Sequence, residues 1–344
     1  MHTSMTAWLG RAIRQLRPLT AALAIALVAG CGGGDGDVAA PRYRAVALAG
    51  DLIDYTVDTA NLTYSYTITE SQFGLTGKTG SGTLTRNSDG SYTPSGASDG
   101  RLIVLPNGIL FGAVSEHFGS DTATMSPILG FKDPVEAISA LAADYNYVQR
   151  ACASSACSVS VGTIRIDAAG SWSLCRDGNV AAATCAGTAA NGTLEARGAG
   201  LWRMKSAGGA VIGTVMGYKS TSAGHNVLLV DLTDKRNGGF GVGMLVGGQQ
   251  TTVTQAMSDG TWVAALGSGP WLQFTASGSD INVTRMNWQA VDLSTALSRN
   301  VPWAGMATTE LRGFIGGDIG FMSGSGVYML RTGDGDSELG VKLP

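Results

Sequence analysis

The stretch 157-CSVSVGTIRIDAAGSWSLC-175 predicts two antiparallel β-strands joined by a tight turn. Before Asp167, valine and isoleucine alternate with serine, threonine and arginine, which is the period-two pattern of a half-buried strand. The connection Asp167–Gly170 has the small and acidic residues that turns favour. The same unit recurs on both sides of this hairpin.

Further segments between residues 145 and 247 repeat the strand pattern at roughly ten-residue spacing. The predicted strands are YNYVQRAC (145–152), CSVSVGTIRID (157–167), GSWSLC (170–175), GTLEARG (192–198), GLWRMKS (200–206), AVIGTVMGY (210–218), HNVLLVDL (225–232) and FGVGMLVG (240–247). Short antiparallel strands with even turns favour a closed barrel, because closure removes exposed strand edges. We therefore predict a mainly β protein of antiparallel sheets, with an up-and-down β-barrel in this middle region.

The flanking regions also consist of strand and turn patterns. LIDYTVD (52–58) and LTYSYTIT (62–69) alternate apolar and polar residues on either side of a short connection, which predicts a hairpin. Comparable segments after residue 250 are GTWVAAL (260–266), PWLQFTA (270–276), INVTRMNWQAV (281–291), ELRGFIGGDIGFM (310–322) and GVYMLRT (326–332). We expect an N-terminal β segment over 42–125, a disulfide-containing barrel-like domain over 126–248 and a C-terminal β segment over 249–344.

One segment, FKDPVEAISALAADY (131–145), predicts a short helix near 133–143. Asp133 suits the N-cap, Pro134 suits the first turn, and Glu136 lies three residues after the cap, as in a capping box. A short helix followed by a run of strands loosely resembles the lipocalin-like barrels over about 120 residues. The Gly-x-Trp opening of that family is absent from YNYVQRAC (145–152).

The N-terminus has the layout of a secretory signal. A basic start with three arginines precedes an apolar run over 19–30, which is too short to span a bilayer. Leu27-Val28-Ala29-Gly30-Cys31 resembles the lipobox of bacterial lipoproteins. The resemblance implies cleavage of the signal peptide 1–30, diacylglycerol on the Cys31 thiol and a fatty acyl chain such as palmitate on the new amino group. Several acyl chains together anchor a protein stably in a membrane.

The glycines that follow Cys31 predict a flexible lipidated tether over 31–41. Gly32, rather than aspartate, follows the cysteine, which resembles the default for transfer to the bacterial outer membrane. We expect a lipid-anchored protein on its periplasmic face or at the cell surface. The alternative is a free or disulfide-bonded Cys31 after an uncleaved helix.

The composition excludes some classes of partner. Removal of residues 1–30 leaves 314 residues and takes away three arginines and no acidic residue, so the net charge changes from −3 to −6. The remaining basic residues are scattered, which argues against nucleic acid as a partner. Only 14% of residues are charged and 50 are glycine, as is typical of β-rich exported proteins.

Four further cysteines predict two disulfides. Cys152, Cys157, Cys175 and Cys185 form an even, clustered set, which in an exported protein indicates disulfides. Three connectivities are possible, and Cys152–Cys157 with Cys175–Cys185 closes the shortest loops. The spacing does not match a zinc site and no histidine lies nearby, so we predict no metal and no cofactor.

No catalytic constellation is complete. His117 and His225 are the histidines after residue 31, and GFMSGSG (320–326) lacks the G-x-S-x-G spacing of a nucleophile elbow. LTGKTGSG (75–82) departs from a phosphate-binding loop and is interpreted as a hairpin. The acidic residues of 334–338 are interpreted as a turn rather than a calcium loop. No spacing selects a catalytic pair among the carboxylates at 51, 54, 58 and 70.

The tryptophans are the candidate ligand-binding residues. Trp172, Trp202, Trp262 and Trp288, with Trp271 and Trp303, lie in the second half of the chain. Such side chains line ligand cavities or fill barrel cores. We hypothesise a lipid-anchored bacterial envelope protein that binds a small ligand or a partner protein without catalysis. The alternatives are an extracytoplasmic hydrolase of glycans or esters and a structural envelope component.

Overall fold

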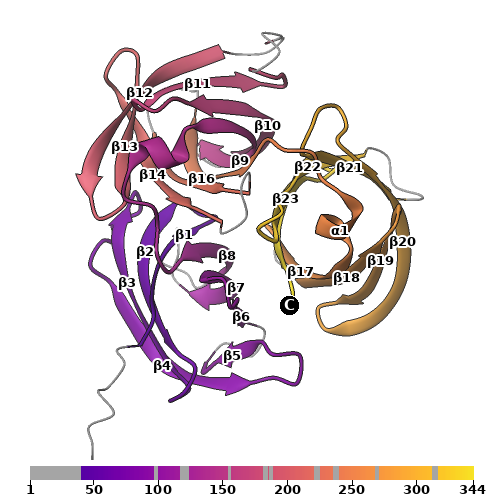
Figure 1. The fold of residues 1–344 in the computed structure, drawn as a ribbon. Helices are drawn as coiled ribbons and strands as arrows, with labels where there is room; N and C mark the ends of the chain where they lie inside the picture. Colours follow the sequence, from indigo (N-terminus) through magenta and orange to yellow (C-terminus); the bar gives the residue numbers. More distant parts are fainter. Residues whose placement is uncertain are drawn as a thin grey trace, which may run out of the picture. The chain divides into compact units, whose positions relative to one another are not determined.

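The computed structural model describes residues 40–96, 100–116, 124–153, 156–180, 185, 189–220, 225–234, 240–267, 271–311 and 317–344. The signal peptide, Cys31 and all of the tether except its last two residues lie outside these ranges. Ala40–Pro344 form one compact unit. Within the described residues, the strands form three closed antiparallel barrels that follow one another along the chain (Figure 1).

The first barrel closes where its first and last strands pair. Its strands are β1 (Arg42–Ala47), β2 (Asp51–Asp58), β3 (Thr63–Ser71), β4 (Thr79–Arg86), β5 (Tyr92–Pro94), β6 (Arg101–Val104), β7 (Ile109–Glu116) and β8 (Thr124–Phe131). The predicted boundary at 125 is wrong, because it cuts through β8. β8 contains Pro127, a residue that is rare within strands because it has no backbone N–H to donate. It precedes Ile128, where the pairing of β8 with β1 begins along the chain.

The second barrel confirms the up-and-down topology predicted for the middle region. Its strands are β9 (Ala143–Ala153), β10 (Ala156–Ile166), β11 (Ser171–Arg176), β12 (Ala189–Gly198), β13 (Leu201–Ser206), β14 (Val211–Tyr218), β15 (Val227–Asp234) and β16 (Gly241–Gln249), and β16 pairs with β9. Asp167–Gly170 forms the predicted turn, since Gly170 N donates to Asp167 O at 3.0 Å. Cys152 is bonded to Cys157 and Cys175 to Cys185, which is the connectivity with the shortest loops that the sequence favoured.

In the third barrel, too, each strand pairs with the next one along the chain. It contains β17 (Gly260–Leu266), β18 (Trp271–Ser277), β19 (Asp280–Met286), β20 (Gln289–Arg299), β21 (Met306–Leu311), β22 (Asp318–Met322), β23 (Val327–Arg331) and β24 (Ser337–Lys342), and β24 pairs with β17. The sequence predicted strands in this region but not their closure into a barrel. It placed 281–291 in one strand, although β19 ends at Met286 and β20 begins at Gln289.

The predicted helix is a single 3₁₀ turn, η1 (Ile138–Leu141). The predicted capping box is wrong, because no side chain caps the turn and its N-cap is Ala137. The preceding backbone is bound elsewhere: Lys132 N donates to Gly108 O at 2.8 Å, and Val135 N donates to Gly217 O at 2.9 Å. These bonds hold the segment extended against the barrels and leave only one turn before β9.

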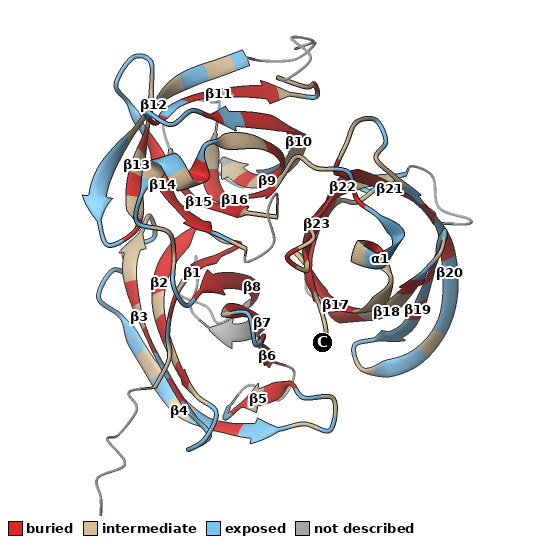
Figure 2. Cartoon of the chain, in the orientation of Figure 1, coloured by how far each residue is buried: buried red, intermediate tan, exposed pale blue. Residues whose placement is uncertain are grey.

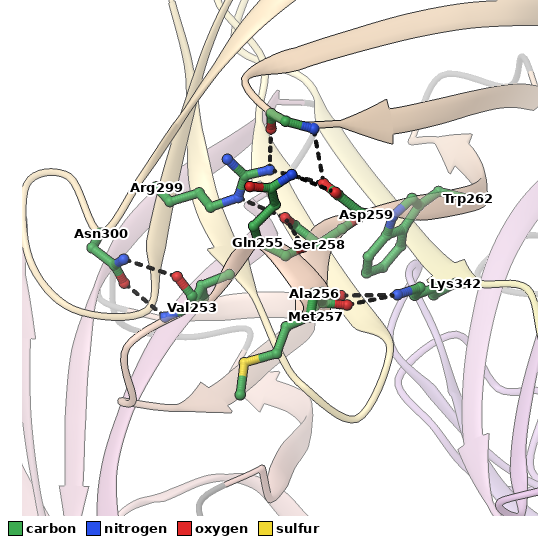
Figure 3. Close-up of polar contacts among 11 residues, drawn as sticks. Val253, Gln255, Ala256, Met257, Ser258, Asp259, Trp262, Arg299, Asn300 and Lys342 are labelled. Carbon is green, nitrogen blue, oxygen red and sulfur yellow. Dashed lines mark hydrogen bonds and ion pairs between the residues drawn. The ribbon is translucent and has the colours of Figure 1, made fainter.

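A second short helix, α1 (Gln255–Ser258), lies at one end of barrel 3 (Figures 1 and 3). Trp262 Nε1 donates to Ser258 O at 2.8 Å, and Arg299 Nε donates to Ser258 Oγ at 2.6 Å. Lys342 Nζ donates to carbonyls of the last turn, where a cation is favoured. In barrel 2, Tyr145 Oη likewise donates to Leu141 O of η1 at 2.9 Å, so both barrels begin with a helical plug fixed to an aromatic residue of the first strand.

Each barrel is filled by its own side chains, and Figure 2 shows buried residues along the strands of all three. Barrel 1 has a tyrosine-rich interior, barrel 2 contains two tryptophans, and barrel 3 contains one. A further apolar cluster lies outside the barrels and joins them. Its members include Val46 and Phe111, Val148 and Met244, and Val263 and Phe321, one pair from each barrel. Strands such as β15 are apolar on both faces because they bound an interior and this junction cluster.

Candidate functional site

Three of the four candidate tryptophans fill barrel interiors. Trp172 and Trp202 lie in the core of barrel 2, and Trp262 lies in the core of barrel 3. Backbone carbonyls accept the indole N–H groups of Trp172, at 3.0 Å from Lys205 O, and of Trp262. Satisfied and buried indoles are what packing requires. Their positions match the core-filling alternative that the sequence left open.

Trp288 instead lies between barrels. It follows β19 in a turn and packs on Trp271, with ring centroids 5.4 Å apart. The guanidinium of Arg101, from β6, lies 4.6 Å from the centre of the Trp288 ring, which is a cation–π arrangement. Trp303 donates its indole N–H to Asn146 Oδ1 at 2.7 Å. These side chains therefore join barrel 3 to barrels 1 and 2.

Among the described residues, His225 is not part of a catalytic arrangement. His117 lies outside the described residues. His225 lies beside the β22–β23 turn, where Ser323 and Ser325 hydroxyls are 2.9 Å apart and Ser323 Oγ reaches His225 O at 3.5 Å. Nδ1 of His225 has no hydrogen-bond partner among the described residues. An imidazole without an orienting acid lacks the arrangement of a serine hydrolase.

The two loop-like motifs are turns. The segment 75–82 runs from the β3–β4 turn into β4, and Lys78 N donates to Leu75 O at 2.9 Å. The segment 334–338 runs from the β23–β24 turn into β24, and Thr332 N donates to Asp336 O at 2.9 Å. In the described part of the chain, no group of three or more acidic, histidine or cysteine side chains is placed to hold a metal ion.

The acidic residues of barrel 1 separate into different surroundings. Asp58 accepts backbone N–H groups in the β2–β3 turn, and Asp54 faces the outer surface. Asp51 and Glu70 lie where barrel 1 meets barrel 2, close to the buried Asp231 of β15. No spacing in the sequence relates these carboxylates to Asp231.

Neither carboxylate oxygen of Asp231 has a hydrogen-bond partner among the described residues. Burial raises the pKa of Asp231 well above its ordinary value, and the charges of Glu70 and Asp51 raise it further, while Arg197 opposes them. Arg197 forms an ion pair with Glu70, which also accepts Thr214 Oγ1 at 3.1 Å. The single cation is thus already paired with one of three carboxyl groups.

A groove of about 390 Å³ on the outer surface of barrel 1 gathers charged groups of both signs. One wall is β1 and β2. Tyr43 and Ala45 point into the barrel, so Arg42 and Arg44 point outward into the groove. Asp54, opposite Arg44 on β2, forms an ion pair with both arginines. Arg44 Nη1 also donates to Ala199 O of barrel 2 at 2.6 Å.

The other wall is the segment between barrel 1 and η1. Lys132, Asp133 and Glu136 are exposed there and form no hydrogen bond or ion pair with any described side chain. Their backbone is fixed by the bonds of Lys132 to Gly108, in the β6–β7 turn, and of Val135 to Gly217, in β14. Burial raises the pKa of the Tyr43 phenol, and the charge of Asp133 raises it further. The β1 arginines, paired with Asp54, therefore face exposed groups of both signs across the groove.

The sequence did not reveal this groove. Its walls come from residues 42–54 and 132–136, which no motif links. The sequence pattern instead assigned Asp133 and Glu136 to a helix cap. The alternation Arg42-Tyr43-Arg44 was the available signal, since it places two arginines on one strand face.

In the described ranges, no helix is long and apolar enough to cross a membrane. Comparison of the chain with protein-family models, curated proteins and solved structures gave no significant match.

Proposed function

We propose that the chain is a lipid-anchored protein of the bacterial outer membrane that binds a small zwitterionic ligand, such as a free amino acid or dipeptide, in the groove of barrel 1. The filled barrels support an external site, because their interiors are occupied by the protein's own side chains. The lipobox at 27–31 supports the anchor. Binding without catalysis is proposed, since the groove holds charges but no nucleophile paired with a base.

The observation that carries the proposal is the set of exposed charges on the 132–136 segment opposite the β1 arginines. A ligand carboxylate can bind Arg42 and Lys132, and its ammonium group can bind Asp133 or Glu136. The volume of about 390 Å³ lies near the lower end of the range for ligand sites, which favours a small molecule.

The test is calorimetric titration of the mature chain, carrying Cys31→Ser for solubility, with amino acids and dipeptides. Dipeptides acetylated at the amino group or amidated at the carboxyl group are the matched ligands that lack one charge. We expect the blocked forms to bind at least about tenfold more weakly. Lys132→Met should weaken binding, whereas Lys205→Met, on β13, should leave it unchanged. Equal binding of free and blocked dipeptides, or no binding, would refute the ligand class.

The anchor is tested separately. The wild-type chain should incorporate labelled palmitate and fractionate with outer membranes, and Cys31→Ser should abolish both, because the thiol is the predicted attachment point. Retention of the variant in the membrane fraction after signal removal would contradict the lipid anchor.

A further inference from the structure

A second, smaller hollow lies where residues from all three barrels meet. Its volume is about 270 Å³. Its lining includes Leu48 after β1, Met125, Ser126 and Pro127 of β8, Arg150 of β9 and Gly267 after β17. It shares no residue with the groove of barrel 1, so its function can be tested independently.

Arg150 is the charged group of this hollow, and it is poorly paired. Its side chain is only 18% exposed. Its Nη1 donates to Cys152 Sγ at 3.5 Å, and sulfur is a weak acceptor. The nearest carboxylate oxygen, of Asp336, is 4.0 Å from Nε, which is beyond hydrogen-bond distance. A largely buried guanidinium therefore keeps donors that no described oxygen accepts.

The cost of this arrangement is electrostatic. Burial lowers the pKa of Arg150, and the charge of Asp336 raises it only in part. The guanidinium nevertheless stays protonated, because its ordinary pKa is far above neutrality. A buried cation with room beside it is stabilised by an anion that enters that room.

Gly267 lies against the guanidinium with no side chain between them. A Cβ atom at this position would lie 3.0 Å from Arg150 Nε and 2.6 Å from Asp336 Oδ1. It would also lie 2.9 Å from Ser337 Oγ, a fully buried hydroxyl with no partner among the described residues. Only glycine lets the backbone come this close to both groups, because any side chain here would crowd them.

Apolar side chains form a smaller part of the lining, away from Arg150 in the sequence. Leu48 belongs to the junction cluster, Met125 packs against that cluster, and Pro127 lies beside them on β8. A bare inorganic anion would gain nothing from these side chains, whereas a carboxylate with a short hydrocarbon body would contact them.

We propose that this hollow is a binding site for a small organic carboxylate, with its charged group on Arg150 and its apolar part against Leu48, Met125 and Pro127. The planar guanidinium fork matches a carboxylate with two parallel hydrogen bonds. Because the lining comes from three barrels, the bound ligand also stabilises their junction.

The test uses benzoate as the probe and benzamide as the neutral molecule of the same shape, titrated into the mature chain by calorimetry and by thermal unfolding. Benzoate should bind saturably and raise the melting temperature, and benzamide should bind at least about tenfold more weakly. Arg150→Met should abolish the difference. Arg165→Met is the matched control, since Arg165 lies on β10 and pairs with Asp144.

A second variant guards against misfolding of the first. Gly267→Ala keeps the arginine but places a methyl group 3.0 Å from its Nε, so the guanidinium must shift and benzoate binding should weaken, while circular dichroism checks that the fold is retained. Inorganic phosphate should bind less tightly than benzoate. Tighter binding of phosphate, equal binding of benzamide, or undiminished benzoate binding in both variants would overturn the proposal.

Discussion

A carboxyl group and a phenol face each other in the interior of barrel 3, and replacing the carboxyl group should change how stability depends on pH. Tyr328 Oη donates to a carboxylate oxygen of Glu338, and both side chains are buried. Burial raises the pKa of Glu338 to about 7 from its ordinary value of 4.5. The hydrogen bond from Tyr328 lowers this pKa, and the nearby charge of Asp318 raises it.

The sign follows from proton binding. Between pH 4.5 and about 7 the folded protein keeps a proton on Glu338 that the unfolded chain releases. This contribution to stability is therefore complete below pH 4.5 and is lost as the pH rises to about 7. A difference of about 2.5 pKa units corresponds to about 3 kcal/mol of unfolding free energy across that window.

Glu338→Gln should remove this dependence, because the amide cannot ionise and still offers an oxygen to Tyr328. We expect the variant to match the wild type near pH 4.5 and to exceed its unfolding free energy by up to about 3 kcal/mol above pH 7. Urea unfolding followed by tryptophan fluorescence across this range is the assay. Asp292→Asn, at an exposed position of β20, is the matched control. Parallel stability curves for the wild type and Glu338→Gln would refute the assignment of a buried, protonated carboxyl group.

The remaining predictions concern the barrel junction and the disulfides. Asp231→Asn should raise stability at neutral pH and remove a loss of about 1.4 kcal/mol per pH unit above the ordinary carboxyl pKa, as measured by urea unfolding at several pH values. Gly50→Ala should destabilise the fold by about 1–3 kcal/mol in thermal unfolding, because its φ is +97° and its Cβ would lie 2.7 Å from Gly243 N. Replacing Cys175 and Cys185 together by serine should lower the unfolding free energy by about 2.5 kcal/mol in denaturant titrations, since the bond closes a loop with a sequence separation of 10.

Each of these has a contrary outcome. An unchanged pH profile in Asp231→Asn would show that its carboxyl group is paired or solvated in solution. A neutral effect of Gly50→Ala would show that the turn after β1 does not approach β16 closely. A double serine variant as stable as the wild type would show that this disulfide does not restrict the unfolded chain as the loop-entropy estimate assumes.

The sequence predicted most of the β-strands, which recur along the chain, and little of the structure of the segments that connect the barrels. Strand spacing predicted the middle barrel because each of its strands has a clear alternation or apolar run. The first barrel was harder to predict, since β5 has only three residues and β8 contains Pro127. The Asp133 cap failed because the backbone of that segment is bound to Gly108 and Gly217, which are distant in sequence.

The sites were less predictable than the fold. Arg150 is an ordinary strand residue in YNYVQRAC (145–152), and only the fold places Gly267 beside it. Tryptophan content suggested ligand binding, yet Trp172, Trp202 and Trp262 lie in cores. An indole has the same sequence signature in either role, and only its burial and hydrogen bonds distinguish them.

The closing strand pairs also bear on how the fold forms. Ala47 pairs with Ile128, Cys152 with Val242 and Leu266 with Glu338, so the contacts that close the three barrels span at least 81, 90 and 72 positions of the sequence. Contacts of such separation form late, because the intervening loop entropy is lost first. During synthesis from the N-terminus, barrel 1 can close before the residues of barrel 3 have been synthesised. The junction cluster, which needs side chains from all three barrels, is then the last part of the structure to assemble.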